Sequence, residues 1–145
     1  MKKNLLILLG GSIGAGLRFA IKNEPSIRLK NDFPLNTLII NLIGCFLIGM
    51  ILTVAFEYYE MDADVRLGIV TGFIGAFTTF STMCKEIYVL MTTGHPIVGL
   101  VYCLFSLLAG FLMVISGVFI ARVLFRANKE KSEVVSFFDK GDEAL

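Results

Sequence analysis

The stretch Gly72-Phe-Ile-Gly-Ala-Phe-Thr-Thr-Phe-Ser-Thr82 lies in the middle of an apolar segment that runs from about residue 67 to residue 91. It carries two glycines followed by four hydroxyl residues, where an ordinary spanning helix would carry leucine and isoleucine. Glycine weakens a helix, and a hydroxyl group costs free energy in lipid unless it faces protein or water. Irregular backbone at membrane depth is tolerated only where protein or a water-filled cavity surrounds it. The stretch therefore predicts a broken helix at a buried site; the alternative is a polar turn packed against neighbouring helices.

The rest of the chain has the composition of a small membrane protein. Its 145 residues are 56% hydrophobic and 17% charged, and the mean hydropathy is +0.79. Crossing a bilayer takes about 20 residues of apolar helix, and four stretches satisfy this, at about residues 4–21, 35–57, 67–91 and 97–125. We therefore predict an all-α integral membrane protein with four transmembrane helices, the third broken mid-membrane. Residues 1–126 form the membrane domain, and residues 127–145 form a polar, flexible tail.

Charge and cysteine usage exclude several classes of function. A net charge of +1 gives no electrostatic reason to bind nucleic acid or an acidic partner. The three cysteines lie singly in separate apolar segments, without metal-ligand spacing or the pattern of a disulfide framework. No nucleophile, base and orienting group are grouped at plausible spacing, so the chain is not predicted to be an enzyme.

Polar side chains recur on two other predicted helices, where lipid would disfavour them. Thr37 and Asn41 are one helical turn apart and share a face of the second helix. On the fourth helix, Tyr102, Ser106 and Gly110 recur every four residues. Each set either pairs with a neighbouring helix or lines a polar track, and their occurrence beside the hydroxyl cluster favours the track.

Three charged residues are candidates for the mouth of such a track. Arg18 is the one cation well inside the first helix, where it anchors the membrane boundary or attracts anions at a vestibule. Lys85 and Glu86 are adjacent on the third helix, so their side chains point in different directions. Each of these two belongs to a water-filled vestibule or pairs with another chain.

Two local features predict structure rather than function. Gly10 and Gly14 have the spacing of small residues that let another helix backbone approach closely. Asp62 or Asp64 is expected to cap the start of the third helix.

The distribution of positive charge predicts how the chain inserts. With four spans, both termini and the acidic loop at residues 58–66 share one side of the membrane. Without the tail lysines, that side carries as many cations as the other: Lys2, Lys3, Arg66, Arg122 and Arg126 against Arg18, Lys22, Arg28, Lys30 and Lys85. Because positive charge near the spans sets orientation, this balance predicts insertion both ways round, with two copies pairing antiparallel.

Four pieces of the sequence together resemble the Fluc family of small bacterial fluoride channels, also called CrcB-like proteins. They are Gly10-Gly-Ser-Ile-Gly-Ala-Gly-Leu-Arg18, Thr37-Leu-Ile-Ile-Asn-Leu-Ile-Gly44, the stretch from Gly72 to Thr82, and the stripe of Tyr102 and Ser106. The third piece is specific, whereas the first alone would be weak. The resemblance covers the four spans and leaves out the tail.

The resemblance implies passive export of cytoplasmic fluoride across the bacterial plasma membrane, which relieves fluoride toxicity. It implies an antiparallel homodimer, or a heterodimer with a paralogue, with two fluoride pores and a central structural sodium ion. The carbonyl groups of Gly75 and Thr78 would hold the sodium. The pore would be lined by the Asn41 amide, the Phe80 ring edge and the side chains of Ser81, Thr82, Met83, Tyr102, Ser106 and Thr37. The vestibule would hold Arg18, Lys85 and Glu86.

Elementary chemistry agrees with these assignments. Fluoride is strongly hydrated, so a pore must replace its water with donors while holding the ion loosely enough to release it. Ring edges carry partial positive charge. Sodium is a hard cation that suits carbonyl groups freed by an unwound turn, and such a cation would favour anions nearby.

One position departs from the family pattern. The family usually has a second Phe three residues after the first, and Met83 stands there. Either this chain conducts with one aromatic residue per pore wall, or it works in a heterodimer with a different subunit that supplies the other ring; a non-conducting subunit is a further alternative. A small proton-coupled multidrug or metabolite antiporter is disfavoured, because the first helix has no carboxylate and Glu57 and Glu86 lie near span ends.

Overall fold

The computed structural model describes the backbone of residues 1–23 and 33–142, and side chains as far as residue 126. Within that part of the chain, every regular element is a helix. Four helical segments are long and apolar enough to cross a membrane: Lys2–Lys22, Leu35–Tyr58, Ala63–Thr92 and Pro96–Arg126. The predicted four-span helical protein is confirmed. Residues 24–32, which connect the first two spans and include Arg28 and Lys30, lie outside the described residues.

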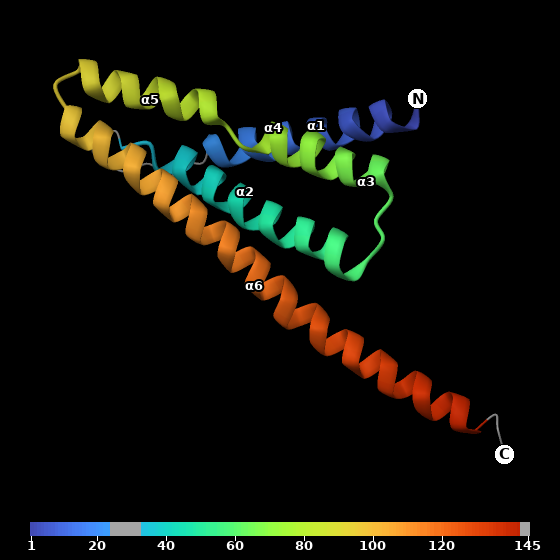
Figure 1. The fold of residues 1–145 in the computed structure, drawn as a ribbon. Helices are drawn as coiled ribbons and strands as arrows, with labels where there is room; N and C mark the ends of the chain where they lie inside the picture. The colour runs from blue at the N-terminus through green and yellow to red at the C-terminus, as the bar shows by residue number, and fades with distance from the viewer. Residues whose placement is uncertain (24–32, 143–145) are drawn as a thin grey trace.

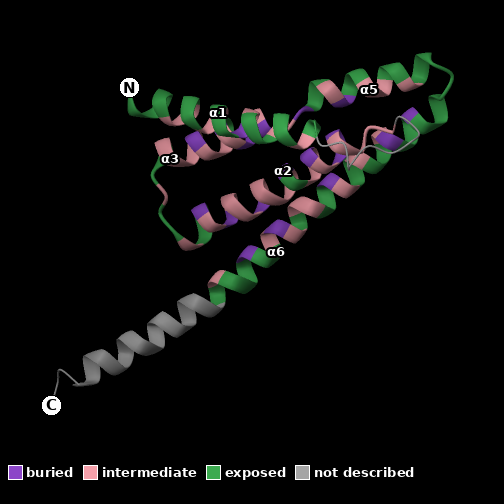
Figure 2. Ribbon diagram, turned by 180° about the vertical axis from the view of Figure 1, so that it is seen from behind, coloured by how far each residue is buried: buried purple, intermediate pink, exposed green. Residues whose placement is uncertain are grey.

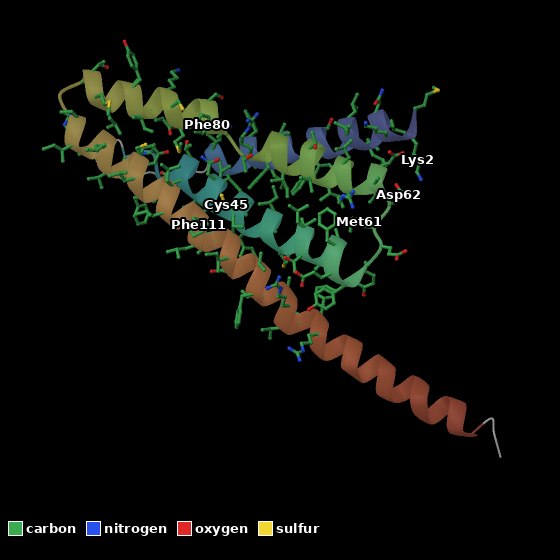
Figure 3. The ribbon with its side chains drawn as sticks, in the orientation of Figure 1. Lys2, Cys45, Met61, Asp62, Phe80 and Phe111 are labelled. Carbon is green, nitrogen blue, oxygen red and sulfur yellow. The ribbon has the colours of Figure 1, made fainter. Side chains whose placement is uncertain are left out.

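The four spans form a small bundle, and both ends of the described chain and the loop before the third span lie at the same end of it, as a four-span topology predicts (Figure 1). Helix α1 (Lys2–Lys22) packs against the third span, and α2 (Leu35–Thr53) packs along α6 (Pro96–Asp142) (Figure 1). The N-terminus, the turn before the third span and the C-terminal part of α6 lie at one end of the bundle (Figure 1). Lys2 and Asp62 mark that end in Figure 3.

The third span is interrupted where the glycine- and hydroxyl-rich stretch predicts a break. It comprises α3 (Ala63–Leu67), the π-helix η3 (Gly68–Ile74), the single turn α4 (Gly75–Phe77) and α5 (Phe80–Thr92). Between α4 and α5, Thr78 is extended at φ −72°, ψ 157°, and Thr79 has φ −147°, ψ 87°. These two residues leave the helical conformation, and the predicted break is confirmed.

The cap of the third span is also resolved. Asp62 is the N-cap of α3, and its side chain accepts hydrogen bonds from the backbone N–H groups of Asp64 and Val65 at 2.9 and 3.2 Å. Of the two carboxylates that the sequence offers, Asp62 is therefore the one that satisfies the exposed amides of the first turn.

Glycines set the close packing of α1 against η3. A Cβ added at Gly10 would overlap the carbonyl oxygen of Gly68, and one at Gly14 would overlap that of Phe73. The contact is reciprocal, because a Cβ at Gly72 would lie 2.6 Å from the carbonyl oxygen of Ile7. The predicted backbone approach at Gly10 and Gly14 is confirmed, and its partner is the segment that leads into the break.

The second and fourth spans pack through glycines in the same way. A Cβ at Gly49 of α2 would overlap the Val114 carbonyl oxygen of α6, and one at Gly117 of α6 would overlap the Phe46 carbonyl oxygen of α2. Small residues at both positions let the two backbones approach, which is how helices associate when lipid removes the hydrophobic driving force.

The second span ends in a π-helix, η2 (Val54–Tyr58), which is tied to α6. Arg122 donates to both carboxylate oxygens of Glu57, at 2.6 Å from Nη2 to Oε1 and 3.0 Å from Nε to Oε2. The rings of Tyr58 and Tyr59 lie 5.8 and 5.9 Å from the ring of Phe125. Glu57 is thus engaged in an exposed ion pair at a span end.

Helix α6 is longer than a membrane span. Its 47 residues correspond to about 70 Å at 1.5 Å per residue, more than twice the roughly 30 Å of a bilayer core. The part beyond Arg126 projects away from the bundle (Figure 1). Residues 127–142, expected to form a flexible tail, continue the same helix.

Most large apolar side chains of the spans face outward. On α1, Gly14 alone is buried, and Leu5, Leu8 and Phe19 are exposed (Figure 2). The outer face of α6 is similarly apolar. A surface of this kind requires lipid or another protein chain against it.

Candidate functional site

The Asn41 side chain of α2 pairs with the backbone at the break. Its Oδ1 accepts the N–H of Thr79 at 2.8 Å, and its Nδ2 donates to the carbonyl oxygen of Thr79 at 3.4 Å. One carboxamide thus satisfies both backbone groups of an extended residue, as a neighbouring strand would. Unpaired backbone groups are costly away from water, so Asn41 stabilises the break.

Hydroxyl groups complete the break locally. Thr79 is the N-cap of α5: its Oγ1 accepts the N–H of Thr82 at 3.4 Å and lies 2.6 Å from the Thr82 hydroxyl oxygen. Thr78 Oγ1 donates to the carbonyl oxygen of Ile74 at 2.9 Å. The hydroxyl groups of Thr78, Thr79 and Thr82 therefore serve first to satisfy the chain at the interruption.

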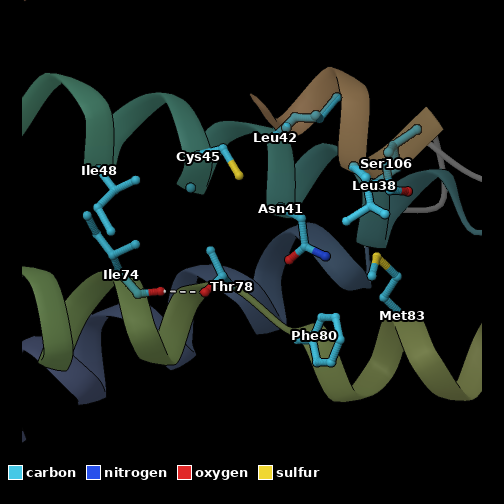
Figure 4. Close-up of a pocket in the computed structure, with 13 residues that line it drawn as sticks. Leu38, Asn41, Leu42, Cys45, Ile48, Ile74, Thr78, Phe80, Met83 and Ser106 are labelled. Carbon is cyan, nitrogen blue, oxygen red and sulfur yellow. Dashed lines mark hydrogen bonds between the residues drawn. The ribbon is translucent and has the colours of Figure 1, made fainter. Parts of the chain in front are cut away.

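A cavity of about 300 Å³ lies beside the break, between α2, the third span and α6 (Figure 4). Four of the predicted pore residues line it: Asn41, Phe80, Met83 and Ser106. Its other lining residues are Leu38, Leu42, Gly44, Cys45, Ile48, Ile74, Thr78, Leu107 and Gly110. The cavity is mostly apolar, with a few polar groups near the break, as expected of a selective binding site.

Few hydrogen-bond donors are left to face this cavity. The Ser106 hydroxyl donates to the carbonyl oxygen of Tyr102, one turn earlier, at 2.6 Å. The Asn41 amide carries two N–H groups, and Thr79 uses one of them. The other makes no hydrogen bond within the described part of the chain. The Asn41 amide is accordingly the donor best placed to meet an anion in the cavity.

A second polar cluster forms around Glu86 of α5. The Thr37 hydroxyl donates to Glu86 Oε1 at 2.7 Å, and the Tyr102 hydroxyl donates to Oε2 at 3.1 Å. Thr37 and Tyr102 are buried, and Tyr102 packs with Met83 and Leu38 in one apolar cluster. Leu38 and Met83 also line the cavity, so the two sites share a wall. The resemblance implies pore positions for Thr37 and Tyr102 and a vestibule position for Glu86, and the structure brings these three side chains together.

The remaining predicted residues lie apart from the cavity lining. Ser81 and Lys85 are exposed on α5, and Thr82 is engaged with Thr79. Arg18 is half-buried near the end of α1. Phe80, in contrast, lines the cavity, although 71% of its surface stays exposed; it lies at the start of α5 (Figure 3).

Sequence reasoning missed two contributors to this site. Thr79 was seen as one of several hydroxyl residues, and its place directly before the α5 pattern, three residues ahead of Thr82, is the signal of an N-cap. Gly44 appears in the sequence analysis only as the last residue of a stretch that carries the resemblance. A Cβ there would overlap Thr78 Cγ2, so Gly44 makes room for the break.

The carbonyl groups of Gly75 and Thr78 fit a small hard cation. In a continuous helix they would accept the N–H groups of Thr79 and Thr82. Those two amides donate instead to Asn41 Oδ1 and Thr79 Oγ1. Neutral carbonyl oxygens are ligands suited to sodium. Within the described residues, no group of three His, Cys, Asp or Glu side chains could hold a metal ion.

Comparison with known proteins gives consistent matches over the four spans. The model of the family described as "CrcB-like protein, Camphor Resistance (CrcB)" matches residues 5–118. A protein from Chloroflexus aurantiacus named "Fluoride-specific ion channel FluC" is 39% identical over 122 residues, covering 84% of this chain and 97% of the relative. Relatives from Roseiflexus sp. (strain RS-1), "Fluoride-specific ion channel FluC", and Carboxydothermus hydrogenoformans, "Fluoride-specific ion channel FluC 2", are each 40% identical. They cover 83% and 88% of this chain and 97% and 96% of their own lengths.

Proposed function

The chain belongs to the CrcB-like family, and from that premise we propose that it is a fluoride channel that lets cytoplasmic fluoride leave the cell down its electrochemical gradient. It is a multi-pass protein of the bacterial plasma membrane and not an enzyme. The observation that carries the proposal is the similarity to proteins named fluoride-specific ion channels, at 39–40% identity across nearly their whole length. The expected relief of fluoride toxicity follows from passive export.

The proposed pathway runs along the cavity at the break. Asn41 offers an N–H to the anion, and the ring edge of Phe80 offers partial positive charge. Ser81, Thr82, Ser106, Tyr102 and Thr37 provide a polar track toward Glu86, and Lys85 and Arg18 lie toward the water-filled ends. Neutral donors in an otherwise apolar cavity hold a small anion without the deep trap that a fixed charge would create.

The proposed working unit is an antiparallel homodimer with two pores. The exposed apolar faces of α1 and α6, together with the exposed ring of Phe80, support a second copy as the neighbour. The carbonyl groups of Gly75 and Thr78 from both copies would hold a central sodium ion. When bound, this cation supplies positive charge that favours an anion nearby.

Met83 is expected to be a tolerated variation rather than a defect. It is 6% exposed and packs against Leu38 and Tyr102 while lining the cavity. Because Met is flexible and close to Phe in size, Met83→Phe should keep fluoride efflux within about threefold of wild type and cost less than about 1.5 kcal/mol of stability. Met83→Ala leaves a void and should cost about 2–5 kcal/mol. Efflux from liposomes and denaturant unfolding of both variants measure these effects.

The alternative function, a partner subunit of a heterodimer, rests on the same position. If the chain needs a second aromatic ring from a different subunit, the wild type on its own should show no fluoride efflux, and the Met83→Phe variant should show efflux. That outcome would reject the homodimer and favour the heterodimer, whereas comparable efflux from the wild type and the variant would reject the heterodimer.

Growth of a fluoride-sensitive bacterium that lacks its own fluoride channels tests the function in a cell. Expression of this chain should restore growth in sodium fluoride medium, and Asn41→Asp expressed at the same level should not. Failure of the wild type to restore growth, with folded protein present in the membrane, would contradict the proposed function.

A further inference from the structure

We propose that Asn41 and Thr79 are positioning residues for the cation site, because they bind the two backbone amides that would otherwise close the helix at Gly75 and Thr78. The inference rests on the proposed function, which places a sodium ion at those two carbonyl groups. It assigns to Asn41 a second task besides meeting the anion, and it gives a task to Thr79, a residue outside both the expected pore lining and the expected sodium ligands.

The first carbonyl group is released by Asn41. In an uninterrupted helix, the Gly75 carbonyl would accept the N–H four residues later, which belongs to Thr79. That N–H donates to Asn41 Oδ1 at 2.8 Å, a short bond from a different helix. The Asn41 carboxamide therefore competes directly with the helical bond and turns the Gly75 carbonyl into an available ligand.

The second carbonyl group is released by Thr79. The Thr78 carbonyl would accept the N–H of Thr82, but this N–H points to Thr79 Oγ1 at 3.4 Å. The Thr79 hydroxyl is held in place by its 2.6 Å contact with the Thr82 hydroxyl, and Thr79 is 5% exposed. A residue this buried, with its Oγ1 fixed as an N-cap, keeps α5 from rejoining α4.

One side chain thus serves both proposed ion sites. Asn41 Oδ1 orients the peptide next to the cation carbonyls, and Asn41 Nδ2 donates to the Thr79 carbonyl at 3.4 Å, which fixes the rotation of the amide. The second N–H of Nδ2 is left for the cavity. The carboxamide oxygen acts on the cation site, and the free N–H acts on the anion site. Removing the oxygen should therefore weaken sodium binding, and removing the N–H groups should reduce fluoride efflux.

Sodium-dependent thermal unfolding of the purified full-length chain tests this assignment without any fluoride present. Sodium chloride replaces N-methyl-D-glucamine chloride at constant ionic strength, and the half-saturating sodium concentration is read from the rise in Tm. Asn41→Leu and Thr79→Val should raise that concentration by about tenfold or more, the usual effect of losing a partner that orients metal ligands. Thr79→Val preserves side-chain shape, so it carries the test if Asn41→Leu does not fold.

Two matched variants, Thr79→Ser and Thr53→Val, should leave the sodium dependence within about twofold of wild type, below the loss expected for orienting partners. Thr79→Ser keeps the hydroxyl. Thr53 is a buried threonine whose hydroxyl donates within α2, to the carbonyl oxygen of Gly49, far along the helix from the break. Thr53→Val therefore removes a buried hydroxyl that does not contact the break. Asn41→Asp keeps the acceptor for the Thr79 N–H and adds a negative charge that attracts sodium, so its half-saturating sodium concentration should not rise.

The possible results separate this inference from the proposed function. Equal sodium dependence in wild type, Asn41→Leu and Thr79→Val would overturn the positioning role, and a wild type indifferent to sodium would overturn it together with the proposed cation. Fluoride efflux measured on the same preparations reports on the channel alone. Loss of sodium dependence in Asn41→Leu but not in Asn41→Asp, with efflux reduced in both, is the expected pattern.

Discussion

Asn41→Asp is expected to reduce fluoride efflux from liposomes at least about 100-fold while the protein stays folded. The substitution removes both N–H donors of the amide and places a carboxylate at the cavity wall. Two like charges about 4 Å apart repel by about 4 kcal/mol at an effective dielectric constant of 20, which corresponds to roughly a thousandfold at 1.4 kcal/mol per factor of ten. Partial protonation of the new carboxylate would reduce this value. A fluoride-selective electrode outside loaded liposomes measures the rate.

Asn36→Asp is the matched control for this change of charge. Asn36 lies on the same helix, and its Nδ2 donates to the backbone oxygens of Ile21 and Lys22 at the end of α1, at 3.4 and 3.0 Å. It does not line the cavity. Efflux in Asn36→Asp should stay within about threefold of wild type, as expected for a substitution that leaves the anion's donors in place. Equal losses in the two variants, or an unaffected Asn41→Asp, would remove Asn41 from the pathway.

The second large effect is expected at the contact between α1 and η3. Gly14→Val should destabilise the protein by more than about 3 kcal/mol, at or beyond the upper end of ordinary overpacking. The reason is that the new Cβ would overlap the Phe73 carbonyl oxygen and lie 3.1 Å from the Phe77 amide nitrogen, both of which are backbone atoms that cannot rotate away. Equilibrium unfolding in detergent measures the loss.

Gly16→Val makes the same chemical change two residues along the helix. A Cβ at Gly16 meets no atom within 4 Å of its position, so this variant reports the general effect of valine in place of glycine on α1. It should change the free energy of unfolding by less than about 1 kcal/mol, the range of helix propensity. Similar losses of unfolding free energy in Gly14→Val and Gly16→Val would show that the close contact of α1 with η3 does not contribute to stability.

The position of the break could be predicted because its causes are local. Glycine weakens the helix, and clustered hydroxyls are costly in lipid, so the residues around Thr78 and Thr79 carry the signal themselves. The same holds for Gly10 and Gly14, whose spacing allows backbone contact whatever the partner. The spacing does not identify the segment that makes this contact, because the packing of α1 against η3 depends on the whole fold.

The bonds that hold the break could not be predicted, because they join distant segments. Asn41 and Thr79 are 38 residues apart, and a polar face identifies which side of a helix turns inward but not what it meets. Asn41 was expected to serve the anion, and its bonds to Thr79 add a structural task. The hydrogen bonds of Glu86 with Thr37 and Tyr102 could not be predicted for the same reason, because helical spacing relates residues within one helix only.

The length of α6 illustrates a limit of reading helices from hydropathy. The apolar run ends at Phe125, which marks the end of the span. The following residues, Ala127 to Lys131, include good helix formers, so helix geometry continues after hydrophobicity stops. The two π-helices, η2 and η3, have no comparable sequence signal.

Fluoride release from liposomes that contain only this purified chain tests the central claim most directly. Liposomes loaded with potassium fluoride or potassium chloride are diluted into salt-free buffer of equal osmolarity, and valinomycin starts the efflux by letting potassium leave. The account predicts rapid release of fluoride and retention of chloride. Retention of fluoride by liposomes that hold folded protein, or release of chloride as fast as fluoride, would contradict it.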